Sequence, residues 1–222
     1  GIYNSPTDMG VNMAGYGIVD DEVCRAAARQ EIVRRYYKTA CDYKTGNTTA
    51  DALERIRLLI NENKIDLAER KVVAPALEKA EISGSAAVAI ELENGTFVTG
   101  KSNKLMSACA SAALNAVKAL SKIDDDMLLL SPVVLAPIIQ LKKEVLREDK
   151  VKLDLNDVLT ALSICAATNP IAEKAMSMLV RLSGCEAHGS CILPEKDLSV
   201  MRKLGVNITC EPEFGSKDLY GF

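Results

Sequence analysis

The stretch that decides the fold is Ser85–Ser131, SAAVAIELENGTFVTGKSNKLMSACASAALNAVKALSKIDDDMLLLS. Over residues 88–92, large apolar side chains alternate with Ala89 and Glu91, which is the period of a strand with one buried face. Asn94-Gly95 favours a tight turn, because both residues tolerate a positive φ. Residues 96–99 are therefore expected to return as the second strand of a β-hairpin.

A helix is expected after the hairpin, over residues 107–120. Its larger polar side chains fall on one narrow stripe, formed by Ser107, Ser111, Asn115 and Lys118. The remaining positions are small or apolar, which is typical of a buried helix that approaches a sheet closely. The apolar run 127–130 is then expected to form a further strand, followed by a helix that begins near Pro132 or Pro137.

The flanking sequence extends this pattern into two parts. Helical periodicity dominates before Ser83-Gly84, whereas helices and strands alternate after it, with strands expected over 185–193 and 206–210. This order predicts an α/β protein, in which a helical subdomain precedes a mixed sheet with helices on both faces. The expected divisions are a polar loop 1–17, a helical subdomain 18–82, an α/β subdomain 83–212 and a tail 213–222.

The composition excludes several classes of protein. The 222 residues carry a net charge of -3 and lack Trp, which argues against a nucleic-acid partner. No apolar run approaches the length of a membrane span, so no membrane partner is expected. Seven irregularly spaced cysteines suit a reducing compartment, and we expect the cytoplasm. Because the sequence begins at Gly1 within a turn-like phrase, we expect it to be part of a longer polypeptide.

The segment 184–191, GCEAHGSC, holds the richest chemistry and includes His188, the single histidine. On a strand, Cys185 and Cys191 share one face while His188 points to the other, so these three residues are not expected to bind one metal ion. The same geometry argues against a Cys–His nucleophile pair. His188 remains a structural hydrogen-bonding residue, or else a catalytic residue that transfers a proton in a pocket.

Ligand contacts are expected from polar side chains in loops and at the ends of helices and strands. The opening loop 5–12 combines several hydrogen-bonding side chains with a glycine, as a binding loop does, although a plain surface loop is the alternative. Asn169 is equally suited to cap a helix, and Asp124–Asp126 suits a solvated turn better than a magnesium site. The predicted ligand-binding residues are Thr7, Asp8, Asn12, Ser131, Asn169 and Ser190.

Several long phrases resemble one bacterial family. They are SPTDMGVNMAGYGIVDDE, QEIVRRYYKTACDYK, ICAATNP, GCEAHGSCIL and RKLGVNITCEP. The sequence is similar to the domain-of-unknown-function family 1846, also called UPF family 0371, and specifically to the C-terminal half of its members. The resemblance implies a missing N-terminal half with a glycine-rich, phosphate-loop-like phrase, so a nucleotide cofactor is expected only through that half.

The resemblance also implies a cytidine-deaminase-like topology for the α/β part. The zinc motifs of deaminases are absent, since the first helix reads SACASAALNAV and the second SPVVLAPII, without the required His, Cys and Glu ligand pattern. No metal site is therefore expected.

Two functions remain open at this stage. The first is an enzyme that acts on a nucleotide or a phosphorylated small molecule together with the N-terminal half of the same protein. The alternative is a non-catalytic module for assembly or ligand sensing, in which nearly apolar helices serve a homo-oligomer interface. A homo-oligomer is the expected assembly in either case.

Overall fold

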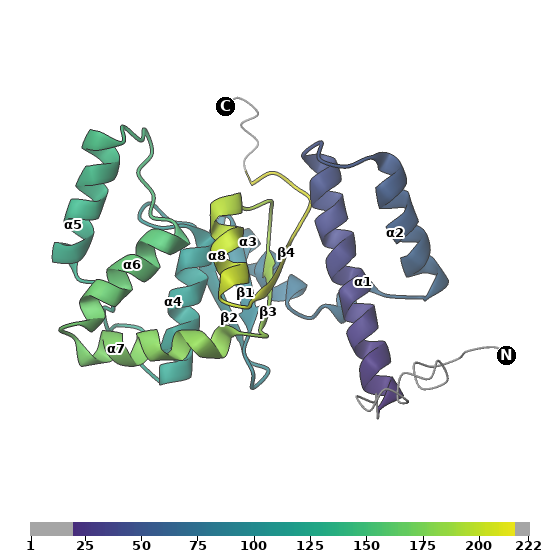
Figure 1. Ribbon diagram of the computed structural model, residues 1–222, viewed down its shortest axis with the longest axis horizontal. Helices are drawn as coiled ribbons and strands as arrows, with labels where there is room; N and C mark the ends of the chain where they lie inside the picture. Colours follow the sequence, from purple (N-terminus) through teal and green to yellow (C-terminus); the bar gives the residue numbers. More distant parts are fainter. Residues whose placement is uncertain (1–19, 216–222) are drawn as a thin grey trace, which may run out of the picture. The chain divides into compact units, whose positions relative to one another are not determined.

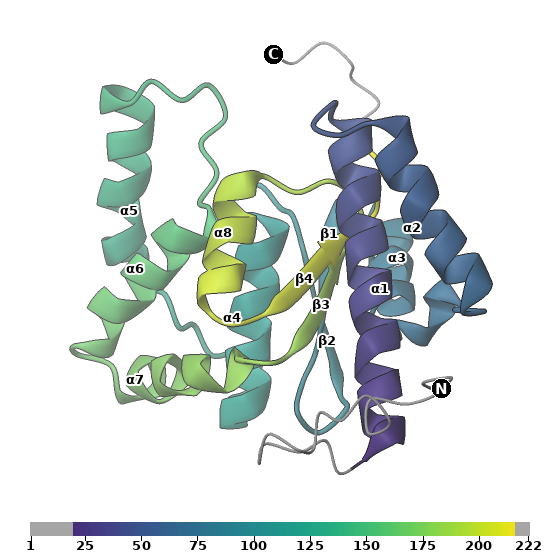
Figure 2. The same ribbon diagram turned by 45° about the vertical axis from the view of Figure 1, so that its right-hand side comes forward.

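The computed structural model describes residues 20–215, and the chain divides into two compact units, Gly1–Arg70 and Lys71–Phe222. The first unit contains α1 (Asp21–Lys44), α2 (Ala50–Glu62) and the short 3-10 helix η2 (Leu67–Glu69). In Figures 1 and 2, α1 and α2 lie side by side. Both begin at capping residues, because the Asp20 and Thr49 side chains accept hydrogen bonds from backbone N–H groups of the first turn.

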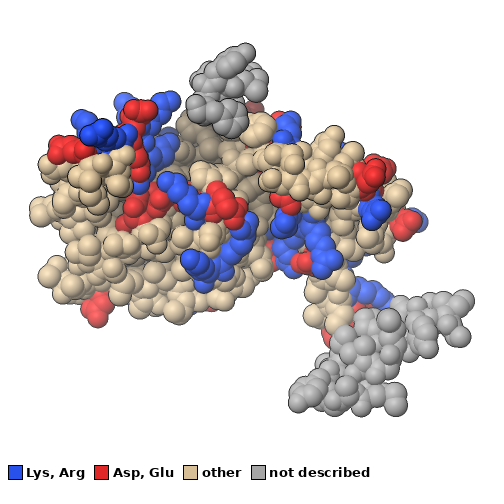
Figure 3. Space-filling model, turned by 45° about the horizontal axis from the view of Figure 1, so that its top comes forward, with Lys and Arg blue, Asp and Glu red and all other residues tan. Residues whose placement is uncertain are grey.

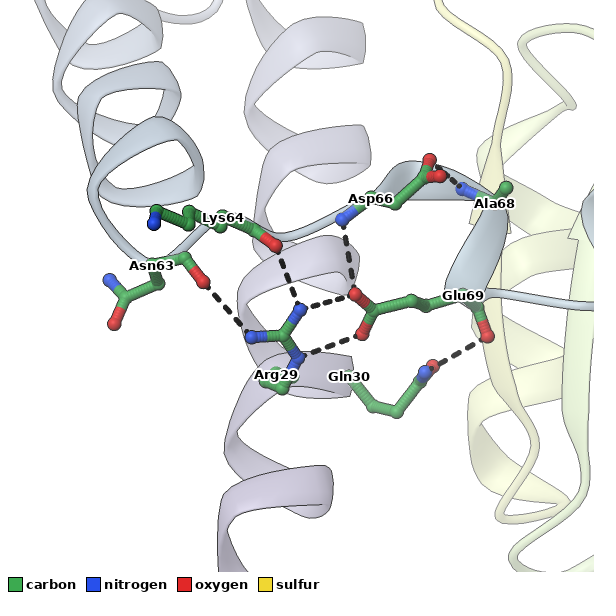
Figure 4. Close-up of polar contacts among 7 residues, drawn as sticks. All are labelled: Arg29, Gln30, Asn63, Lys64, Asp66, Ala68 and Glu69. Atoms are coloured by element: carbon green, nitrogen blue, oxygen red, sulfur yellow. Dashed lines mark hydrogen bonds and ion pairs between the residues drawn. The ribbon is translucent and has the colours of Figure 1, made fainter.

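One arginine ties the three helices of this unit together (Figure 4). The Arg29 guanidinium forms a two-pronged ion pair with the Glu69 carboxylate, with an Nε–Oε2 distance of 2.9 Å. It also donates to the carbonyl oxygens of Asn63 and Lys64, both at 3.0 Å, at the end of α2. Asp66 and Glu69 form a capping box around η2. Arg29 of α1 therefore has a structural role, because it holds α1 to η2 and to the end of α2.

The second unit is built on a four-stranded mixed sheet in the order β2-β1-β3-β4. Its strands are β1 (Ala87–Glu91), β2 (Phe97–Lys101), β3 (Glu186–Gly189) and β4 (Asn207–Cys210). The antiparallel hairpin of β1 and β2 is confirmed, with Ala89 opposite Thr99. On the other side of β1, β3 pairs antiparallel to it and β4 pairs parallel to β3. The prediction of an α/β protein with a mixed sheet is confirmed.

Helices cover both faces of the sheet. Ala89 packs with Val72 and Ala76, so its face meets α3 (Val73–Ser83). Gly100 neighbours Thr99, the cross-strand partner of Ala89, and therefore lies on the opposite face. That face packs against α4 (Ala108–Ser121). The structure thus places α3, which the sequence grouped with the preceding helices, in the compact unit that contains the sheet.

Close packing of α4 depends on Gly100. A Cβ atom at this position would lie 2.1 Å from the backbone nitrogen of Ala112. Ala112, Ala113 and Ala116 are buried as well, so the helix backbone can approach the strand. The predicted buried, alanine-rich helix is confirmed, with Ser107 as its N-terminal cap.

One predicted strand does not form. Residues 127–130 run from α4 to α5 without β-structure, and the β2 edge stays unpaired by any strand among residues 20–215. Leu129 and Leu130 are buried, while Leu128 is 75% exposed. The apolar run thus reflects packing of two leucines rather than a β-ladder. The remaining elements are α5 (Pro132–Gln140), the π-helical turn η3 (Leu141–Val145), α6 (Leu155–Ala166), α7 (Pro170–Ser177), the 3-10 helix η4 (Met178–Leu182) and α8 (Glu195–Lys203).

The distribution of charge on the surface and the apolar character of the helices can be compared with the sequence. On the face drawn in Figure 3, basic and acidic side chains lie intermingled among uncharged ones. Within residues 20–215, none of the helices has both the length and the apolar character needed to cross a bilayer.

Candidate functional site

A cavity of about 510 Å³ lies at the open edge of β2. Residues 99–101 of β2 form one wall, α4 forms a second, and the segment from Met127 to Leu135 forms a third. Its apolar lining includes Leu105, Met106, Leu114, Leu129, Leu130 and Leu135. Volume and apolar character both fall in the range of small-molecule sites.

The charged residues that line this cavity are all lysines. Lys79 of α3, Lys101 of β2 and Lys118 of α4 line it, and its lining within the described residues includes no Asp or Glu. Lys118 Nζ donates a hydrogen bond of 2.6 Å to the carbonyl oxygen of Asp125. A cavity with lysines on an apolar wall attracts anions, because the low dielectric strengthens charge–charge attraction.

Uncharged polar groups reach the cavity from α4. Asn115 Nδ2 donates to the Thr99 carbonyl oxygen at 2.8 Å, which fastens the helix to the β2 edge. Ser111, one helical turn earlier, also lines the cavity and is 8% exposed. Its hydroxyl has no hydrogen-bond partner in the structure. Three residues of the predicted polar stripe, Ser111, Asn115 and Lys118, therefore line the cavity.

A second cavity, of about 650 Å³, is also lined by the segment that follows β2, with Asn103 in the lining of both cavities. Lys104, Lys150 and Lys152 line it, together with Ser102 and Gly84. Lys152 Nζ donates to Ser102 Oγ at 2.7 Å. This cavity lacks the leucine wall of the first, so it is the more polar of the two.

His188 lies in β3 and is fully buried. Its Nδ1 is 2.8 Å from Thr209 Oγ1, and its Nε2 is 3.1 Å from Glu211 Oε1. Thr209 stands opposite His188 in the parallel ladder of β3 and β4. The imidazole lines neither cavity. This environment suits a histidine that joins two strands through hydrogen bonds.

The other predicted ligand-binding residues in the described part do not gather at one point. Asn169 caps α7, accepting a hydrogen bond of 2.9 Å from the Ile171 N–H. Ser190 Oγ accepts one of 2.9 Å from the Ala87 N–H. Ser131 precedes α5, and its N–H donates to Cys165 Sγ. None of these three side chains lines either cavity. The predicted sites Thr7, Asp8 and Asn12 lie outside the described residues.

The thiols and carboxylates are the remaining candidates for a nucleophile or a metal ligand. All seven cysteines are free thiols, and burial raises the pKa of the Cys109 thiol well above its usual value. Such a thiol stays protonated and is a poor nucleophile. Among residues 20–215, no cluster of three or more His, Cys, Asp or Glu side chains is placed to hold a metal ion.

Sequence reasoning missed the lysines and the β2 edge that build the first cavity. One signal was available in the sequence, because three polar residues of α4, Ser111, Asn115 and Lys118, share a stripe on a mostly apolar helix. A stripe of this kind on a buried helix must face either solvent or a polar site. Lys79 and Lys101 gave no such signal, since lysines at a helix and at a strand end are ordinary surface residues.

Comparison with known proteins decides the family. The model described as "Domain of unknown function DUF1846, C-terminal" matches residues 68–220, and the corresponding N-terminal model matches residues 1–64. The chain belongs to the DUF1846 family. A UPF0371 protein of Clostridioides difficile (strain 630) is 48% identical over 99% of the chain, and one of Clostridium botulinum (strain Okra / Type B1) is 47% identical over the same share.

The matches also correct one prediction. The chain does not resemble the C-terminal half of the family alone, because residues 1–64 match the N-terminal domain model of DUF1846. Even so, the chain spans 45% of the length of these two UPF0371 relatives. The DUF1846 family is one of unknown function, and its name assigns no substrate to the cavity at β2.

Proposed function

We propose that the second unit binds a nucleotide or a phosphorylated small molecule in the cavity at the β2 edge. The observation that carries this proposal is the composition of the cavity wall, where leucines combine with Lys79, Lys101 and Lys118 and with no carboxylate in the described part. An apolar wall suits the body of a ligand and the lysines suit its phosphate. In an enzyme, the remaining part of a longer DUF1846 protein would supply the second substrate or the chemistry.

The test is isothermal titration calorimetry of the whole chain with AMP, ribose 5-phosphate and inorganic phosphate. Lys101→Glu places a negative charge in the cavity, which repels the phosphate of the ligand. It is expected to weaken binding of AMP at least about tenfold. Lys104→Glu changes the net charge equally but lies in the second cavity, so it is the matched control and should change affinity less than about threefold.

Two results would contradict the proposal. One is that none of the three compounds binds at millimolar concentration. The other is that Lys104→Glu weakens binding as much as Lys101→Glu, because the attraction would then come from net charge or from the second cavity.

The alternative function, an assembly module, is favoured by one observation. The helix α5 and the turn after it expose apolar side chains, with Val133 82%, Val145 66% and Leu146 59% exposed. The proposed occupant is a second copy of the chain, as in a homo-oligomer. Sedimentation analysis over a dilution series tests it, because Val145→Lys should then lower the molar mass in solution.

The cytidine-deaminase-like topology and a cytoplasmic location also belong to this proposal. The hairpin followed by α4 and the strand order of the sheet support that topology, whereas the unformed strand at residues 127–130 counts against it. Seven free cysteines support a reducing compartment.

A further inference from the structure

The alternation of hydrogen-bonded pairs in the hairpin leaves some backbone groups of β2 without a partner in β1. Leu92 N–H donates to the Thr96 carbonyl and Ser102 N–H donates to the Ala86 carbonyl, at the two ends of the β1–β2 ladder. In an antiparallel ladder, every second residue pair exchanges hydrogen bonds. Thr99 and Lys101 fall on the alternate positions. Their backbone N–H and C=O groups therefore point away from β1, toward the free edge of the sheet.

The first cavity lies along this free edge. Thr99 and Lys101 both line it, and the Thr99 carbonyl already accepts one hydrogen bond from Asn115. The outward N–H groups of the two residues lie at the wall of a mostly apolar cavity. No strand in residues 20–215 pairs with this edge, so these donors are open to an acceptor on a ligand.

Ser111 supplies a second, independent observation. Its hydroxyl is buried and lacks a partner, although buried hydroxyls are normally hydrogen-bonded. Within residues 20–215, Ser121 is the other such hydroxyl, but it does not line the cavity. Ser111 and Asn115 are four residues apart on α4, so they lie on the same helix face. Together with the Thr99 backbone they form an uncharged polar end of the cavity.

We infer that this polar end binds a nucleobase, so that the ligand is a nucleotide rather than a sugar phosphate. The inference rests on the proposed function and names its ligand class. A nucleobase has flat apolar faces that suit leucine walls, and its edge carries the adjacent donors and acceptors that pair with a strand edge, a serine hydroxyl and an amide. A sugar ring has hydroxyls on both faces and would leave them unpaired against leucine.

The test compares ligands that share a phosphate but differ in the base. AMP, GMP, CMP and UMP are titrated into the whole chain beside ribose 5-phosphate. At least one nucleotide should bind about tenfold or more tightly than ribose 5-phosphate. Ser111→Ala should weaken that nucleotide about five- to tenfold, the usual effect of one hydrogen bond, and leave ribose 5-phosphate unchanged.

Ser121→Ala is the matched control, because it removes an unpartnered buried hydroxyl that does not line the cavity. It should change neither affinity. The inference is overturned if nucleotides and ribose 5-phosphate bind equally tightly, or if Ser111→Ala and Ser121→Ala have equal effects. In either case the proposed function stands as long as Lys101→Glu still weakens binding of ribose 5-phosphate. If no phosphorylated compound binds, both fail. Since Ser111→Ala removes an unsatisfied hydroxyl, the variant is expected to fold.

Discussion

Buried titratable side chains of this protein serve structure in their present contacts. His188 contacts Thr209 and Glu211, and Asp197 accepts a 2.8 Å hydrogen bond from the Leu155 N–H at the start of α6. Burial raises the pKa of Asp197 above its usual value, and the hydrogen bonds from Leu155 and Ser107 only partly offset this effect. The single histidine stood out in the sequence, whereas Asp197 did not.

The raised pKa of Asp197 predicts a pH-dependent effect of Asp197→Asn. The folded state binds the proton more tightly than the unfolded state, so the favourable contribution of Asp197 is complete below about pH 3.9 and is lost as the pH rises through the folded pKa. Asn keeps the acceptor oxygen without the charge. The free energy of unfolding is measured in urea for both proteins. The value for the variant minus the value for the wild type should therefore increase as the pH rises from 4 to 7.

Asp154→Asn is the control with the opposite sign. Burial raises the pKa of Asp154, but the Asp157 N–H and Lys196 outweigh burial and lower it. Its contribution is present above the unfolded pKa and is lost as the pH falls through the folded one. This variant should lose stability at pH 7, and less at pH 4. The same pH trend in both variants would contradict these assignments.

At the scale of elements, α4 against β2 is the contact that determines the cavity. The packing predicts that Gly100→Ala destabilises the protein by about 1 to 3 kcal/mol, the usual cost of overpacking. This is the opposite of the usual effect, because alanine in a strand is normally more stable than glycine. Urea unfolding measures the loss. Gly189→Ala is the matched control in β3, where the added Cβ meets the flexible side chain of Leu193 and should cost less. A neutral or stabilising Gly100→Ala would refute the close approach.

The elements predictable from the sequence were those with a clear period or a cap. The hairpin at Asn94-Gly95, the alanine-rich helix and the cap at Asn169 follow from local chemistry. The strand over residues 127–130 was wrong because a short apolar run does not distinguish a ladder from two buried leucines. The cavity could not be predicted, since it depends on which edge of the sheet stays unpaired.

For the whole molecule, the site is contained within residues 71–222, while the chain spans less than half of its UPF0371 relatives. Binding at the β2 edge can therefore be tested on this chain alone. The reaction of a longer DUF1846 protein, if it is an enzyme, is a separate proposal that also depends on the remaining part of such a protein.

The most direct test of the β2 site is an NMR titration of the ¹⁵N-labelled chain with AMP. The largest amide shifts are expected at Thr99 and Lys101, with smaller shifts along α4 around Ser111 and Asn115. The amides of Lys104 and Lys152 in the second cavity, and that of His188, should stay in place. Shifts confined to those three residues, or no shift at millimolar AMP, would contradict the claim that the open edge of β2 binds the ligand.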